Sequence, residues 1–138
     1  MFRALFLAAP LALLVATGAQ TRAADEENPV VKMIKGKLKD EKKTFAILVT
    51  FKVKAGNEKK FEEAFAPCLT ATRKEPGCIA YYLNRDPDAP NTYIMYESFK
   101  GIPGLEAHMK EKHTQTLLAT VIPMCEGDPQ IKVLGVPD

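Results

Sequence analysis

The spacing of apolar residues along the chain predicts a strand followed by a helix in its middle section. Residues 45–53 (FAILVTFKV) are rich in β-branched and aromatic side chains, as in a strand with one or both faces buried. From Asn57, a candidate helix cap, apolar residues recur at the spacing of an amphipathic helix that ends near Glu75. Pro67 lies inside this helix and removes one backbone hydrogen bond, which predicts a kink or a break near Ala66.

The pattern of apolar residues after residue 77 predicts three more strands and further helices. Residues 78–85 (CIAYYLNR) alternate with the period of a strand, and residues 92–100 follow a proline-rich turn as its antiparallel partner. A second helix begins near Pro103, a further helical piece carries apolar residues over 117–122, and residues 130–134 form a last strand. The order β-α-β-β-α-(α)-β predicts an α+β fold, a four-stranded antiparallel sheet with its helices on one face.

Residues 1–24 have the pattern of a secretory signal peptide. A short basic start precedes an apolar run and then small residues, with candidate cleavage sites after Ala19 or at Ala23/Ala24. The apolar run of roughly 13 residues is shorter than the ~20 that a membrane-spanning helix needs, so cleavage is favoured over anchoring. We therefore expect a secreted or periplasmic protein without stable membrane insertion after cleavage.

Residues 25–43 are dense in charge and are predicted to be a charged linker, ahead of a domain over residues 44–136. The spacing of Val30, Ile34 and Leu38 leaves a short docked helix open as an alternative.

The net charge of +2 depends on the predicted leader. Of the 19 basic residues, Arg3 and Arg22 lie in it, so 17 basic residues balance the 17 acidic ones after cleavage. A neutral chain has no overall field that attracts polyanions, which argues against nucleic acid as a partner.

The cysteines and histidines do not form a recognisable metal motif in the sequence. Of the three cysteines at most two can pair, and Cys68 and Cys125 fall where small buried apolar residues are expected. Five residues turn a helix by about 140°, so His108 and His113 share a face only if the helix breaks between them. Their spacing also differs from the i, i+4 spacing of two metal ligands on one helix, and no metal site is predicted.

Apolar residues occur on both faces of the predicted strands, whereas helices cover only one face of the sheet. The uncovered face should then meet a second subunit, which predicts a homodimer.

Several short motifs keep the order and spacing of a known family, the antibiotic biosynthesis monooxygenase (ABM) domain, over about residues 44–136. They are 51–56 (FKVKAG), 71–78 (ATRKEPGC), 85–87 (RDP), 96–97 (YE) and 105–108 (LEAH), with a histidine at 113. The chain resembles the quinol monooxygenase-like branch of that family. The resemblance implies a ferredoxin-like dimeric α/β barrel. Some members of the family oxygenate quinols or polyketide phenols with no cofactor, neither metal nor flavin. An aromatic or quinol-like small molecule and dioxygen are then the expected partners.

The resemblance also suggests site residues. His108 matches the family's helix histidine and is expected to be the general base, with Tyr81 or Tyr96 hydrogen-bonding substrate oxygens. Glu97 is costly to bury without a partner. An arginine partner would make it structural, and a histidine partner would make it the group that orients a base. Substrate-binding roles are expected for Tyr96, His113 and Phe65.

Adjacent residues on a strand point to opposite faces, so only one of Tyr81 and Tyr82, and one of Tyr96 and Glu97, can face the helices. Two other functions stay open: a non-catalytic dimeric module that binds a small lipophilic molecule, and an isomerase resembling the autoinducer-processing members of the family. Haem chemistry is disfavoured, because the chain has no tryptophan and residues 45–53 contain no asparagine.

Overall fold

The computed structural model describes residues 27–135 and Pro137. The predicted signal peptide, 1–24, and the last residue of the predicted domain, 136, lie outside the described residues. The elements in chain order are α1 (Pro29–Lys35), β1 (Phe45–Lys52), α2 (Glu58–Thr72), β2 (Cys78–Arg85), β3 (Thr92–Phe99), α3 (Gly101–Lys110), α4 (Lys112–Val121), the 3₁₀ helix η1 (Ile122–Met124) and β4 (Gln130–Gly135).

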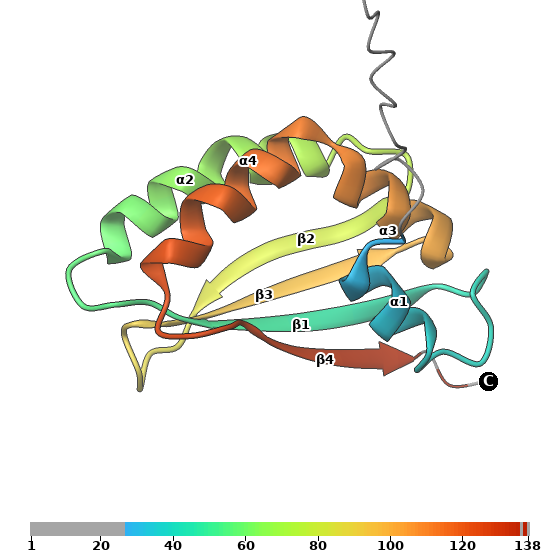
Figure 1. Ribbon diagram of the computed structural model, residues 1–138, viewed down its shortest axis with the longest axis horizontal. Coiled ribbons are helices and arrows are strands. Elements are labelled where there is room, and N and C mark those ends of the chain that lie inside the picture. Colours follow the sequence, from blue (N-terminus) through green and yellow to red (C-terminus); the bar gives the residue numbers. More distant parts are fainter. Residues whose placement is uncertain (1–26, 136, 138) are drawn as a thin grey trace, which may run out of the picture.

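The four strands form one antiparallel sheet in the order β2-β3-β1-β4, and the helices lie on one face of it (Figure 1). This confirms the predicted ferredoxin-like α+β fold. Ile47 pairs with Glu97, which pairs with Tyr81, and this row faces the helices. The next row, Leu48, Tyr96 and Tyr82, therefore faces away from the helices.

Helix α2 differs from its prediction at Pro67. The helix runs without a break from Glu58 to Thr72, so the predicted break near Ala66 is wrong. Pro67 lies on the exposed side of the helix, and so does Glu63, whose carbonyl loses its partner. Water can bind that carbonyl, while Phe61 and Phe65 hold the other side of the helix in the core.

The predicted charged linker contains a docked helix and needs correction. Asn28 caps α1 by accepting a hydrogen bond of 2.9 Å from the backbone amide of Val30. Val31 and Ile34, 1% and 0% exposed, belong to the main core. Because burial of two such side chains stabilises by about 1.5–3 kcal/mol each, residues 29–35 fold as part of the domain.

The segment after α1, residues 36–44, is fixed to the start of α3. The amide of Ile102 donates a hydrogen bond of 2.7 Å to the carbonyl of Glu41. Gly101 makes this approach possible, since a Cβ at its position would lie 2.6 Å from the same oxygen and its φ is +72°. This segment is thereby held beside the helix that carries His108.

All three cysteines are free, and Cys68 and Cys125 are buried as predicted. Within residues 27–135, the structure contains no helix of the length and apolar character required to cross a bilayer.

Candidate active site

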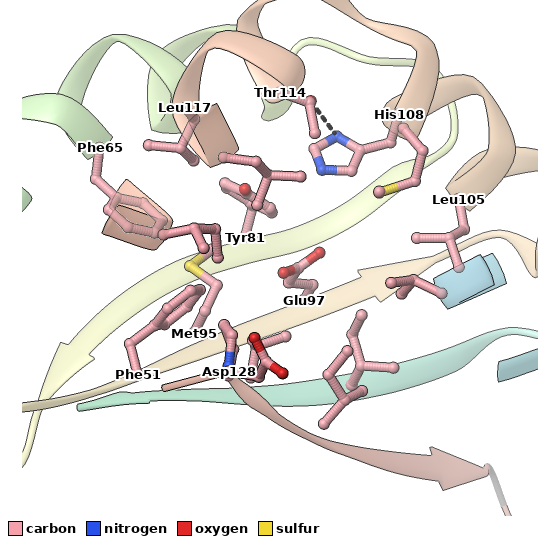
Figure 2. Close-up of a pocket in the computed structure, with 18 residues that line it drawn as sticks. Phe51, Phe65, Tyr81, Met95, Glu97, Leu105, His108, Thr114, Leu117 and Asp128 are labelled. Atoms are coloured by element: carbon pink, nitrogen blue, oxygen red, sulfur yellow. Dashed lines mark hydrogen bonds between the residues drawn. The ribbon is translucent and has the colours of Figure 1, made fainter. Parts of the chain in front are cut away.

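A cavity of about 340 Å³ lies between the sheet and the helices, and most of its lining is apolar (Figure 2). Four buried polar side chains line it from four elements, Tyr81 from β2, Glu97 from β3, His108 from α3 and Thr114 from α4, and the exposed Asp128 also belongs to the lining. The predicted residues Tyr81, Glu97, His108 and Phe65 are thus brought to one cavity. Such a cavity, apolar with a few convergent polar groups, is typical of a small-molecule site.

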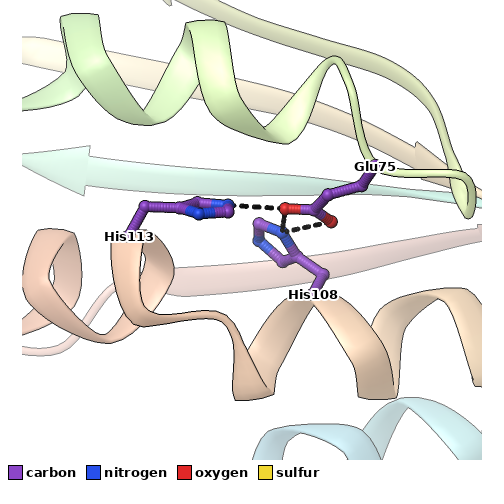
Figure 3. Close-up of side chains that lie close together, drawn as sticks. All are labelled: Glu75, His108 and His113. Carbon is purple, nitrogen blue, oxygen red and sulfur yellow. Dashed lines mark hydrogen bonds and ion pairs between the residues drawn. The ribbon is translucent and has the colours of Figure 1, made fainter.

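The two histidines meet because the helix breaks between them. Glu111 has an extended conformation, φ −66° and ψ 138°, and it separates α3 from α4. Both imidazoles then contact the carboxylate of Glu75, which follows α2 (Figure 3). His108 Nδ1 lies 3.0 Å from Glu75 Oε1, and His113 Nε2 lies 2.6 Å from the same oxygen.

The contact with Glu75 decides what His108 can do in the cavity. A carboxylate only accepts hydrogen bonds, so the neutral imidazole carries its proton on Nδ1 and donates it to Glu75. The Thr114 hydroxyl lies 3.3 Å from the same nitrogen. The other ring nitrogen, Nε2, points into the cavity (Figure 2). Within residues 27–135 no side chain is hydrogen-bonded to this nitrogen, so its lone pair is free. Burial lowers the pKa of His108, against the raising effect of Glu75, and favours this neutral form.

Glu97 lies on the floor of the cavity, and Figure 2 shows its carboxyl group pointing inward. No side chain of the described part of the chain is hydrogen-bonded to it. Burial, with a smaller effect from the negative charge of Glu75, raises the pKa of Glu97 to about 8. At neutral pH this side chain is mostly a neutral acid that can donate a hydrogen bond. The carboxylate in contact with His108 is that of Glu75, so the histidine partner on which an orienting role of Glu97 depended is absent among the described residues.

Tyr81 is buried, and its ring centroid lies 5.3 Å from that of His108. Its hydroxyl lies 3.9 Å from Cys68 Sγ, a weak partner. Burial raises the pKa of Tyr81, so the phenol stays protonated and can donate a hydrogen bond to a bound molecule.

Two predicted substrate-binding residues lie outside the cavity. Tyr96 belongs to the row on the opposite sheet face, beside Tyr82, which is 54% exposed. His113 contacts Glu75 from the outer side, with its side chain 24% exposed. A substrate bound in this cavity would therefore contact neither residue.

Glu75 and Thr114 are the site residues that the sequence did not assign. Glu75 lies in the ATRKEPGC motif, just before the Pro-Gly that ends the helical segment. Its place in this motif was the only indication in the sequence that it could belong to the site. Its partners lie 33 and 38 residues further along the chain, beyond any local spacing rule.

Comparison with known proteins gives one family. The model of the family described as "Antibiotic biosynthesis monooxygenase" matches residues 44–120. A protein from Nitrosomonas europaea described as a putative antibiotic biosynthesis monooxygenase has a similar structure, with a TM-score of 0.67 and 22% identity; the match covers 72% of this chain and 95% of that chain. One from Caulobacter crescentus with the same description gives a TM-score of 0.64 and 25% identity, covering 71% and 93%. No curated protein matches the chain.

Proposed function

Because the chain belongs to the antibiotic biosynthesis monooxygenase family, we propose that it is an exported monooxygenase that oxygenates a quinol or phenolic small molecule without a bound cofactor. One observation carries the proposal. The Nε2 lone pair of His108 faces an apolar cavity, while Glu75 holds the opposite side of the ring.

The side chains present fit the demands of this chemistry. Nε2 of His108 would remove the proton of a substrate hydroxyl, and Glu75 would stabilise the imidazolium that forms. Tyr81 and the neutral Glu97 would donate hydrogen bonds to the substrate oxygens. The apolar lining would keep water from reactive intermediates.

The electrons come from the substrate itself. A deprotonated quinol reduces dioxygen, one oxygen atom enters the ring, and the other leaves as water. The ring becomes a hydroxyquinone, so the four electrons that dioxygen accepts all come from the quinol, and no external reductant is needed.

The test is oxygen consumption by the purified protein with a panel of reduced naphthoquinones and phenols. We expect at least one of them to be consumed in equal amounts with dioxygen, and isotopically labelled dioxygen to leave one labelled atom in the product. Spontaneous oxidation is subtracted with a protein-free control. If no member of the panel is oxygenated, but one raises the melting temperature, the cavity belongs to a non-catalytic binding module.

We propose further that two copies pack through the sheet face that the helices leave open. Support comes from the row of Leu48, Tyr96 and Tyr82, which runs across three adjacent strands on that face. Sedimentation at micromolar concentration should show a dimer, and Leu48→Asp should dissociate it because a charge would enter an apolar contact. Lys59→Asp, on exposed α2 surface, is the matched control. A wild-type chain that sediments only as a monomer would refute the dimer.

Export is a proposal that depends on residues 1–24 alone. In a secreting host we expect the mature protein outside the cytoplasm, starting after Ala19, Ala23 or Ala24. N-terminal sequencing of the fractionated protein checks this, and an intact Met1 on the cytoplasmic protein would contradict it.

A further inference from the structure

We propose that Glu75, His108 and His113 bind a divalent transition-metal ion such as Zn²⁺. The ion would lie behind His108, on the side of the imidazole away from the cavity. Binding of the ion is independent of the proposed oxygenation, although the effect on activity described below rests on it.

The donor set supports this site. Each of the three residues offers one possible ligand atom, and these three atoms lie within 4.8 Å of one another. Two imidazoles and one carboxylate make up a common ligand set for zinc and for other first-row divalent ions, with one or more positions left for water. The residues come from the segment after α2, from α3 and from α4, so the fold and not one flexible loop brings them together.

The distances require only a small adjustment. Bonds of about 2.0–2.1 Å to a tetrahedral ion place ligand atoms roughly 3.3 Å apart. The present hydrogen-bonded separations are 3.0 Å from His108 Nδ1 and 2.6 Å from His113 Nε2 to Glu75 Oε1. Side-chain rotations that move each nitrogen less than 1 Å further from this oxygen would bring both pairs to the separation that a tetrahedral ion requires.

The surroundings of His113 also suit a metal ligand. When Nε2 binds an ion, the proton of the ring moves to Nδ1, and ligating histidines usually donate that proton to a carboxylate or carbonyl. Glu111 Oε2 lies 4.0 Å from His113 Nδ1 and could receive it after a small movement. The side chains of His113 and Glu75 are 24% and 11% exposed, which gives an ion a route from solvent.

An ion at this site would change the role of His108. Without it, Nδ1 carries the proton and Nε2 is a free base that faces the cavity. With the ion on Nδ1, the neutral ring must carry its proton on Nε2, which then donates a hydrogen bond and no longer accepts a proton. The bound ion should therefore inhibit a reaction that uses His108 as its base.

The test uses tag-free protein that has been treated with EDTA and moved into chelator-free buffer near neutral pH. Calorimetric titration with Zn²⁺ should show one ion per chain, and Co²⁺ should develop the visible absorption of a low-coordinate centre. His113→Ala and Glu75→Gln should each weaken binding at least ~10-fold, whereas Lys112→Ala, next to His113 but exposed, should not. Circular dichroism of each variant verifies that it is folded.

The outcomes separate the two proposals. Absence of Zn²⁺ and Co²⁺ binding by the folded wild-type chain, or binding that His113→Ala leaves unchanged, would overturn the metal site and show that the three side chains form a hydrogen-bonded cluster only. Metal binding without any oxygenase activity would leave the site in place and count against the proposed function. When both hold, saturating Zn²⁺ should slow oxygen consumption at least ~10-fold.

Discussion

The variant His108→Ala is expected to consume dioxygen with a quinol substrate at least ~10-fold more slowly than the wild-type chain. His108 is the only imidazole that lines the cavity among the described residues, and its Nε2 carries the free lone pair there. A general base typically raises a rate by about 10²-fold or more. The rate should therefore fall at least ~10-fold even if only part of this contribution is lost. The measurement is initial oxygen uptake at several quinol concentrations, which separates kcat from KM.

His113→Ala is the matched control for this variant. It also removes an imidazole and one contact to Glu75, but it leaves the pair of Glu75 and His108 in place. We expect a clearly smaller loss of rate than for His108→Ala. Equal oxygen uptake by the wild-type chain and by folded His108→Ala would refute the role of His108 as the base.

The second large effect concerns stability and pH. The pKa of Glu97 in the folded chain is about 8, raised by burial from 4.5, so the folded state holds a proton that the unfolded chain has lost between these values. The free energy of unfolding should therefore decrease as the pH rises from about 4.5 to 8. At about 1.4 kcal/mol per pH unit, this group alone gives an upper limit of roughly 5 kcal/mol.

Glu97→Gln should remove most of this dependence, since the amide has the shape of the neutral acid and does not ionise. Urea unfolding near pH 5 and above pH 8, at one protein concentration, measures the difference between variant and wild type. The variant should be the more stable of the two at the higher pH. The exposed Glu126→Gln serves as a control that keeps the wild-type slope. Parallel pH curves for wild type and Glu97→Gln would show that Glu97 is ionised in the folded chain.

The local pattern of apolar and polar residues was sufficient to predict the strands and to separate the side chains that face opposite sides of the sheet. Because side chains alternate along a strand, Glu97 and Tyr96 of β3 must point to opposite faces of the sheet. The structure shows that Glu97 is the one that lines the cavity. The same pattern predicted the ends and breaks of helices less well. Pro67 does not break α2, because its ring and the carbonyl it deprives of a partner both lie at the surface. Likewise, the charge of residues 25–43 favoured a linker over the short helix that the spacing of apolar residues left open, and the structure contains that helix with Val31 and Ile34 buried.

The sequence by itself determined the strands and helices after residue 44, their order and the family, because these depend on periodicity and on short motifs. The spacing of His108 and His113 also implied that the two side chains could share a face only if the helix breaks between them. Only the tertiary structure decided that α3 and α4 separate at Glu111 and that both imidazoles meet Glu75. The physical reason is distance along the chain: these contacts join residues 33 and 38 positions apart, and packing of helices against the sheet, not local spacing, brings them together.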